Sequence, residues 1–235
     1  MSSSNLQTVI VTEANVGSQS AADKVRDTFP TEHGSKLTTV FVGDLTKPEH
    51  FRPVFDDTTV GVIHVASPVH AKAEDNVRDT LDPAVKGATG ILEASKAYVG
   101  PSFRRVVHTS SFAVVIDPKK GSRTGYIYTE SDWNPTTFEE AVAMREHVSL
   151  YTASKALSER AVWDWMAQRK PHFDLACLCP SMVLGPHLEQ IETLDDVRSA
   201  AKLLWGLVDA TETSKLEFAG CIDVRDTAAM LVAAF

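Results

Sequence analysis

Short apolar, β-rich runs alternate with amphipathic segments along the chain, and this alternation limits the possible folds more than any other feature. The runs predict strands at Thr8–Val11, Leu37–Val42, Val60–Val65, Arg105–His108 and Phe173–Leu178. The segments between and after them predict helices at Ser20–Thr28, Asp75–Tyr98, Thr137–Arg145, Leu150–Gln168, Leu194–Val208 and Asp226–Phe235. Such alternation is typical of a parallel sheet with helices on both faces. We therefore expect an α/β fold, a doubly wound parallel sheet, in a single domain over residues 1–235.

Composition and charge exclude several classes of function. The 235 residues carry a formal net charge of −8, which gives no electrostatic footprint for nucleic acid. No segment approaches the roughly 18 continuous apolar residues of a membrane span. The N-terminus has neither the basic start nor the apolar stretch of a secretory signal, so we expect a cytosolic protein. The three cysteines have no metal-ligand spacing, so we expect buried thiols and no metal site.

The residues that follow the predicted strands are the first candidates for a functional site, because doubly wound sheets bind ligands beyond the carboxyl ends of their strands. The segment Arg105–Ser111 ends in Thr-Ser-Ser, and Tyr151 and Lys155 follow in a helical pattern. Positions i and i+4 share a helix face, so the ammonium group can lie near the phenol and lower its pKa. A tyrosine so placed can donate or accept a proton near neutral pH.

The spacing of Tyr151 and Lys155 is a short pattern that also arises by chance. In the plainer interpretation, Tyr151 is an ordinary residue of an amphipathic helix, and Ser110 and Ser111 are polar residues that end a strand. The wider context decides between the two interpretations.

Six segments, in order along the chain, provide that context: His64–Pro68, Arg105–Ser111, Thr129–Pro135, Tyr151–Lys155, Pro180–Pro186 and Ile222–Asp226. Together they resemble the extended short-chain dehydrogenase/reductases. Within these the chain most resembles the group of dihydroflavonol reductases, cinnamoyl-CoA reductases and NADPH-dependent aldehyde/ketone reductases. The likeness extends from about Gln19 to Phe235.

The resemblance implies a Rossmann-like fold and reduction of a small-molecule carbonyl compound by hydride from a nicotinamide. NADP(H) is the implied cofactor, with NAD(H) as the alternative. By their place in the motifs, Tyr151 would donate the proton and Lys155 would lower its pKa and hold the nicotinamide ribose. Ser111, the second serine of its motif, would donate a hydrogen bond to the substrate oxygen.

The resemblance also implies cofactor contacts at three further places. Asp44 and Leu45 match the pair that contacts the adenine. The loop beside the phosphates and ribose is matched by Val65, Ala66 and Ser67. The loop that packs on the nicotinamide is matched by Pro180, Ser181, Met182 and Val183, with Cys179 where the family usually has asparagine.

Plainer interpretations exist for several of these residues. Asp44 can be a turn or cap residue. His64 and His108 can be core histidines, and Cys177 and Cys179 can pack on one face of a strand.

The N-terminal part departs from the family. A dinucleotide-binding half needs a glycine-rich turn after its first strand, where the backbone approaches the pyrophosphate. Here Glu13, Val16 and Gln19 occupy the three glycine positions. The stretch from Thr8 to Asp44 is also shorter, by about one helix and a loop, than three strands and two helices require. We therefore expect an N-terminally shortened fold that lacks the glycine turn, the first helix and most of the second strand.

Two further departures concern the cofactor phosphate and the substrate. Gly17 and Ala21 replace the basic residues that usually select the 2′-phosphate of NADP. The family continues beyond the Ile222–Asp226 motif into a smaller lobe, so we expect an incomplete substrate-binding portion in about 187–220.

Three functions remain open from the sequence. The first is an NADPH-dependent reductase of an aldehyde or ketone in a small-molecule or secondary-metabolite pathway. The second is a non-catalytic, truncated remnant of such a reductase. The third is a nucleotide-sugar epimerase or dehydratase, because those enzymes use a similar pair of tyrosine and lysine.

Overall fold

The computed structural model of the chain describes residues 7–12, 19–29, 31–67, 73–121, 123–186, 193, 197, 199–208, 211 and 220–235. Four parallel strands form the main sheet in the order β1 (Thr8–Thr12), β2 (Thr59–His64), β3 (Arg105–Thr109) and β4 (Asp174–Leu178). A second, two-stranded parallel sheet consists of β5 (Met182–Leu184) and β6 (Cys221–Asp223). The α-helices are α1 (Gln19–Asp27), α2 (Thr31–Gly34), α3 (Asp82–Tyr98), α4 (Phe138–Val142), α5 (His147–Arg169), α6 (Ser199–Trp205) and α7 (Val224–Ala234).

Short helical turns complete the described elements. These are the 3₁₀ segments η1 (Pro48–Val54), η3 (Phe112–Val114) and η4 (Pro118–Lys120) and the π-helical turn η2 (Val77–Leu81). The sequence predicts one helix over Asp75–Tyr98 with a kink or a new start at Pro83. The structure confirms the new start, because η2 ends at Leu81 and Pro83 lies in the first turn of α3. Proline is tolerated there, since the N–H that it lacks has no partner within the helix.

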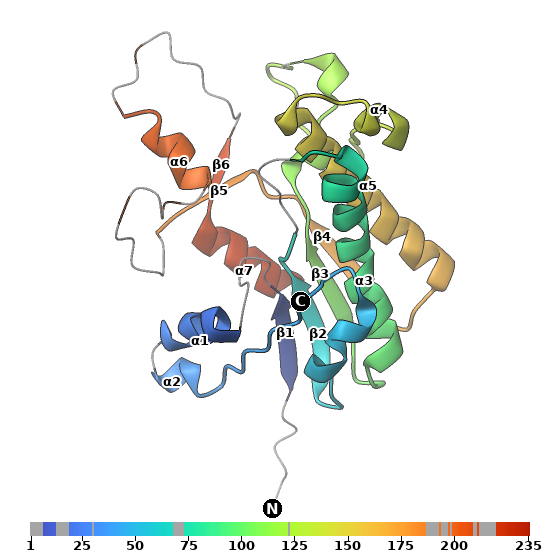
Figure 1. Cartoon of the computed structure of the whole chain (residues 1–235), viewed down its shortest axis with the longest axis vertical. Coiled ribbons are helices and arrows are strands. Elements are labelled where there is room, and N and C mark those ends of the chain that lie inside the picture. The colour runs from blue at the N-terminus through green and yellow to red at the C-terminus, as the bar shows by residue number, and fades with distance from the viewer. Residues whose placement is uncertain are drawn as a thin grey trace, which may run out of the picture.

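Helices cover both faces of the main sheet, as Figure 1 shows. On one face α3 and α5 pack against Val62 and Val106, which form the main core with Ile91 and Leu92 of α3 and Trp165 of α5. On the other face Leu231 of α7 packs against Ile63 and Val107. The prediction of a doubly wound parallel sheet is therefore confirmed.

The C-terminal residue completes the core on the α7 face. The ring of Phe235 lies against Gly61 of β2, where a Cβ atom would come within 2.1 Å of the ring. The guanidinium of Arg104 stacks on the same ring, with its Cζ 5.5 Å from the ring centroid. Glycine at position 61 therefore makes room for the end of the chain.

The predicted strand at Leu37–Val42 is wrong, because this run has no strand structure. Its backbone instead bonds to one side chain of α1: Gln19 Nε2 donates to the Thr39 oxygen at 3.2 Å, and Phe41 N donates to Gln19 Oε1 at 2.9 Å. β1 is the outermost strand of the described sheet, so no neighbouring strand gives the run a ladder of hydrogen bonds. The expected loss of the second strand stays a prediction, because residues 13–18, which follow β1, lie outside the described part.

Other boundaries differ from the predictions at the helix ends. α5 begins at His147 and ends at Arg169, whereas α4 ends at Val142, three residues before its predicted end. Of the helix predicted at Leu194–Val208, α6 occupies Ser199–Trp205, and residues 194–196 and 198 lie outside the described part. The strands β5 and β6 were not predicted, since three residues carry too little periodicity.

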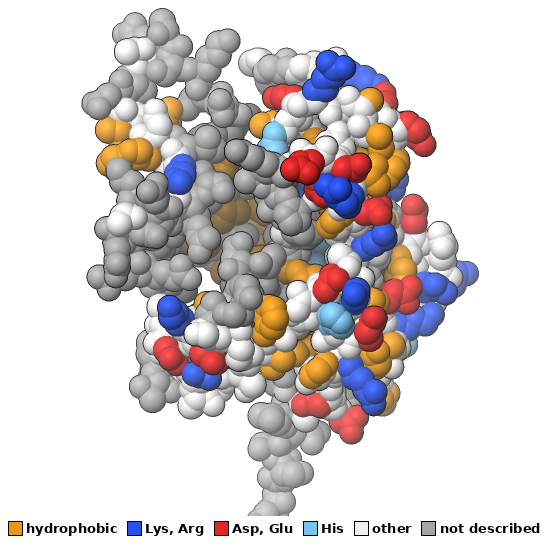
Figure 2. Space-filling model, viewed as in Figure 1, with side chains coloured by type: hydrophobic (Ala, Val, Ile, Leu, Met, Phe, Trp, Pro, Cys, Tyr) orange, Lys and Arg blue, Asp and Glu red, His pale blue; other side chains and the backbone are white. Residues whose placement is uncertain are grey.

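The described surface carries charges of both signs. Figure 2 shows acidic and basic side chains interspersed over this face. Two of the ion pairs among the described residues join Arg78 to Asp79 and Lys86 to Asp82, each at 2.6 Å. No helix in the described ranges is both long enough and apolar enough to cross a membrane.

Candidate active site

The segments that leave β3 and β4 run side by side beyond the sheet. Ser110 N donates to the Leu178 oxygen at 2.7 Å, and Phe112 N donates to the Pro180 oxygen at 2.9 Å. Ser111 lies between these two bonds, and its Oγ accepts a bond from Ala113 N at 3.2 Å, which caps η3. These bonds bring Ser111 beside the segment that follows β4.

The long helix α5 carries Tyr151 and Lys155 one turn apart. Most of the phenol of Tyr151 is buried, and it interacts with the side chain of Ser111. Lys155 is only 6% exposed, and its Nζ donates to Ser67 Oγ at 3.4 Å. The structure thus brings together four residues that the motifs predicted from distant segments, Ser67, Ser111, Tyr151 and Lys155.

The electrostatics of Tyr151 differ from the prediction. We expected Lys155 to lower the pKa of the phenol, yet its pKa is raised, chiefly by burial, and the hydrogen bond with Ser111 acts in the opposite direction. Burial also lowers the pKa of Lys155, and the charge of Glu159 opposes that shift. Removal from water disfavours the charged form of both groups. The phenol therefore keeps its proton in this state of the protein.

The end of β2 is tied to β1 at the carboxyl edge of the sheet. Val65 N donates to the Thr12 oxygen at 3.2 Å, and Ala66 N approaches Thr12 Oγ1 at 3.4 Å. Ser67 follows and reaches Lys155. The predicted loop Val65–Ser67 therefore leaves the sheet directly beside the catalytic candidates.

Asp44 and Leu45 belong to a separate turn. Asp44 Oδ1 accepts bonds from Thr46 N at 2.9 Å and from Thr46 Oγ1 at 2.7 Å, and these bonds hold the pKa of the carboxyl group below its usual value. Leu45 packs against the main core. Asp44 thus fills the turn role that the plainer interpretation proposed, and its contact with a cofactor stays a prediction.

Of the predicted loop Pro180–Val183, only the first half is a loop. Pro180 and Ser181 lie outside regular structure, whereas Met182 and Val183 belong to β5 and pair with Cys221 and Ile222 of β6. Met182 and Val183 are strand residues and not loop residues, because the distant β6 supplies a partner strand that local sequence does not reveal. Their contact with a cofactor stays a prediction.

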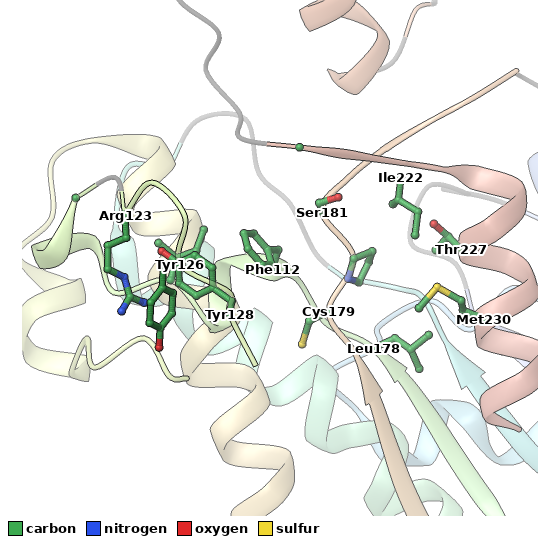
Figure 3. A pocket seen from close by; sticks show the side chains of 14 residues that line it. Phe112, Arg123, Tyr126, Tyr128, Leu178, Cys179, Ser181, Ile222, Thr227 and Met230 are labelled. Carbon is green, nitrogen blue, oxygen red and sulfur yellow. The ribbon is translucent and has the colours of Figure 1, made fainter. Parts of the chain in front are cut away.

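A cavity of about 710 Å³ lies next to these residues. In Figure 3 the rings of Phe112, Tyr126 and Tyr128 form one side, Ile222 and Met230 lie opposite, and Leu178, Cys179 and Ser181 lie between. A mostly apolar cavity of this size suits a small organic molecule. Neither Ser111, Tyr151 nor Lys155 belongs to the lining, but Phe112 follows Ser111 directly.

A cationic side chain supports the aromatic side of the cavity. The guanidinium Cζ of Arg123 lies 3.4 Å from the ring centroid of Tyr126 and 4.7 Å from that of Tyr128. Asp132 completes the group, because it accepts a bond from Tyr126 Oη at 2.6 Å and lies 3.6 Å from Arg123 Nη2. We did not predict these residues, and the only signal was two tyrosines just before the Thr129–Pro135 motif.

Two histidines lie beneath Lys155 in the sheet. His64 and His108 are buried and stack with ring centroids 5.4 Å apart, and His64 Nδ1 bonds to Thr12 Oγ1 at 2.6 Å. Within the described residues, no partner binds His64 Nε2 or either ring nitrogen of His108. Burial and the charge of Lys155 lower the pKa of His64 to about 3. They are core histidines, as the plainer interpretation proposed, but one of their four ring nitrogens has a hydrogen bond among the residues that the structure describes.

The residues that depart from the family at the cofactor phosphates are described only in part. Glu13, Val16 and Gly17 lie outside the described residues, as does most of 187–220. Gln19 is described, and its amide group is occupied by Thr39 and Phe41. The described residues therefore fit the nicotinamide and ribose end of a dinucleotide, through Ser67, Tyr151 and Lys155, and show no cradle for its pyrophosphate.

Comparison with known proteins gives relatives along most of the chain. An NADPH-dependent methylglyoxal reductase of Saccharomyces cerevisiae, GRE2, is 32% identical over 226 residues, which are 93% of this chain and 65% of that protein. A ketoreductase of Aspergillus niger, azaE, is 39% identical over 137 residues, which are 57% of this chain and 38% of that protein. The chain thus spans less than two thirds of the length of either relative.

A solved structure and a family model agree with these matches. The crystal structure of Gre2 from Candida albicans in complex with NADPH superposes with a TM-score of 0.83 at 26% identity and covers 97% of this chain and 67% of that one. The model of the 3-beta hydroxysteroid dehydrogenase/isomerase family matches residues 5–233. The chain therefore belongs to this family, within the extended short-chain dehydrogenase/reductases.

Proposed function

We propose that the chain is an NADPH-dependent reductase that acts on an aldehyde or ketone group of a small molecule. One observation carries this proposal: Tyr151 and Lys155 lie one turn apart on α5, with Ser111 beside the phenol and Ser67 beside the ammonium group. This is the arrangement that proton donation to a carbonyl oxygen requires. Two relatives that are named as reductases of carbonyl compounds support it.

In this proposal each residue has one task. Tyr151 donates its phenolic proton to the carbonyl oxygen, and its raised pKa keeps that proton available at neutral pH. Ser111 Oγ donates a hydrogen bond to the same oxygen as negative charge develops there. Lys155 Nζ holds the nicotinamide ribose and stabilises the phenolate that remains. The bound NADPH supplies the hydride.

The cavity beside Phe112 receives the substrate in this proposal. Its apolar lining favours an organic carbonyl compound over a charged metabolite. The preference for NADPH over NADH rests on the relatives that are named for NADPH. A role in secondary metabolism is part of the proposal and rests on the resemblance to the ketoreductase.

Cofactor binding tests the proposal first. We expect NADPH to bind the purified chain with micromolar affinity in calorimetry and to raise its thermal stability, because a ligand that binds only the folded state stabilises it. A panel of aldehydes and ketones with excess NADPH then identifies turnover by the loss of nicotinamide absorbance.

The alternatives give different results in the same experiment. A cooperatively folded protein that binds neither NADPH nor NADH is the non-catalytic remnant. A protein that binds NAD(H) and converts only nucleotide sugars is the epimerase or dehydratase. Either result overturns the proposal.

A further inference from the structure

A buried carboxyl group lies one helical turn beyond Lys155, and the reaction proposed above gives it no task. Glu159 is 4% exposed, and Lys155 is 6% exposed. Because residues four positions apart share a helix face, Tyr151, Lys155 and Glu159 form one row on α5. A charge removed from water requires hydrogen-bond donors or an opposite charge close by.

Two neutral donors hold the two carboxylate oxygens. Trp163 Nε1 donates to Oε1 of Glu159 at 3.2 Å from the next turn of α5. Cys179 Sγ donates to Oε2 at 3.4 Å from the segment that follows β4. Burial, and then the charge of Glu159, raise the pKa of Cys179 to about 12, so the thiol stays protonated and can donate. Glu159 therefore connects the catalytic helix to a residue that also lines the cavity.

Lys155 is the buried cation four residues before this carboxylate on the same face of α5. Burial lowers the pKa of Lys155, and the charge of Glu159 is the largest influence in the other direction. The other titratable groups whose electrostatic effects involve Lys155 are His64 of β2 and His108 of β3. Both histidines are neutral at ordinary pH, because burial lowers their pKa values. Among the groups of the described residues that interact with Lys155, Glu159 thus supplies the full negative charge.

We propose that Glu159 is a positioning residue of the active site: its carboxylate keeps Lys155 protonated inside the protein, and its bond to Cys179 holds the Cys179–Pro180 segment at the cavity. The consequence for the reaction rests on the proposed function. The charge pairing is a property of the folded chain alone. By the family resemblance, Cys179 stands where asparagine is usual, so the thiol gives this carboxylate a donor in place of an amide.

The charge pairing is tested without cofactor. In protein labelled with ¹³C at the lysine ε-carbon, the NMR signal of Lys155 is the one that a Lys155→Met variant lacks. We expect Glu159→Gln to lower the pKa of Lys155 by about one unit or more, since the amide keeps the size of the side chain and removes its charge. Glu139→Gln, at an exposed carboxyl group on α4, is the matched control and leaves the pKa unchanged. An unchanged Lys155 titration in folded Glu159→Gln overturns the proposal.

A second variant guards against misfolding. If Glu159→Gln does not unfold cooperatively, Glu159→Asp replaces it, because the shorter side chain keeps the charge and withdraws it from Cys179. The pKa of Lys155 then falls by less than one unit, and no fall at all contradicts the proposal.

The role of Cys179 is tested by turnover. We expect Cys179→Ala to raise KM for the carbonyl substrate several-fold with a smaller change in kcat. We expect Cys179→Ser to have a KM close to that of the wild type, because serine keeps a hydrogen-bond donor. Equal KM values in the wild type and Cys179→Ala refute the second half of the proposal. A chain that fails to bind NADPH refutes the proposed function and leaves the NMR experiment on Lys155 intact.

Discussion

The strand order of the main sheet runs from β1 at one edge to β3 and β4 at the other, and we call these the β1 side and the β3–β4 side. The two sides differ in how completely other residues cover them. On the α7 face, Val107 of β3 is fully buried beneath Leu231. Val11 of β1 lies on the same face, in register with Ile63, and is 64% exposed, and Val9 is 38% exposed. The helix that the sequence predicts to be missing would follow β1, and this is the surface on which such a helix could pack.

The difference teaches that the proposed chemistry and the cofactor phosphates depend on separate parts of the fold. Ser111 and Cys179 follow two paired central strands, and Tyr151 and Lys155 lie on a helix that packs against the main core. Within the described residues β1 has no further strand beside it, and Gln19 uses its amide to hold the adjacent run. The proposed proton-donor group therefore comes from other segments than the turn after β1 that would hold the cofactor phosphates.

The largest expected effect concerns the β3–β4 side. If this side is a working active site, Tyr151→Phe lowers kcat/KM for carbonyl reduction by about 10²–10⁴-fold, because it removes the proton donor. NADPH-dependent turnover measures the loss. Tyr98→Phe, which removes a hydroxyl group at the end of α3, is the control with unchanged rate. Similar kcat/KM values for the Tyr151 variant and the wild type would contradict the assignment of Tyr151 as the proton donor.

A pair of valine substitutions compares the two sides directly. Val107→Ala lowers the free energy of unfolding by about 2 kcal/mol, because it opens a cavity in a closed core. Val11→Ala, the same change on the same face, changes it by less than about 0.5 kcal/mol, because the side chain is already in water. Urea denaturation measures both. Equal losses would show that β1 is covered in solution.

The packing of the C-terminus is tested at Gly61. Gly61→Ala places a methyl group against the Phe235 ring and 2.7 Å from the Arg105 oxygen, so we expect a loss of about 1–3 kcal/mol in the free energy of unfolding. Gly100→Ala is the control, since its Cβ meets nothing closer than 3.9 Å. Thermal or urea unfolding of the two variants decides whether Phe235 closes the α7 face. Identical stabilities would contradict that contact.

We expect sensitivity to acid from the buried histidine pair, His64 of β2 and His108 of β3. The pKa of His64 is lowered to about 3 in the folded protein, and that of His108 is also lowered, while both are near 6.5 in the unfolded chain. The unfolded state therefore binds more protons below about pH 6.5, and stability falls as the pH is lowered from there toward the folded pKa. Each histidine contributes about 1.4 kcal/mol per pH unit.

Urea unfolding from about pH 7.5 to about pH 4.5 measures this slope, because the range brackets the unfolded histidine pKa of about 6.5. His108→Leu makes it shallower, because it removes one of the two buried histidines. A slope that is identical in His108→Leu and the wild type would show that the pair does not titrate on unfolding.

Much of the central architecture could be predicted from local patterns. The apolar runs of β1, β2, β3 and β4 and the period of α5 are strong signals, since each element buries a face that its own residues define. The spacing of Tyr151 and Lys155 predicted that they share a helix face, but their selection as site residues rested on the resemblance of six ordered segments. The short strands β5 and β6 were not predictable, because three residues carry no period.

The sequence by itself therefore determined the fold class, the order of the main elements and the tyrosine–lysine pair. Only the tertiary structure decided that Leu37–Val42 is no strand, because a strand requires a partner strand and the described residues place none beside this run. It also decided the direction of the Tyr151 pKa shift and the position of Glu159 beside Cys179. Burial and long-range contacts set these properties, and both depend on residues far apart in the chain.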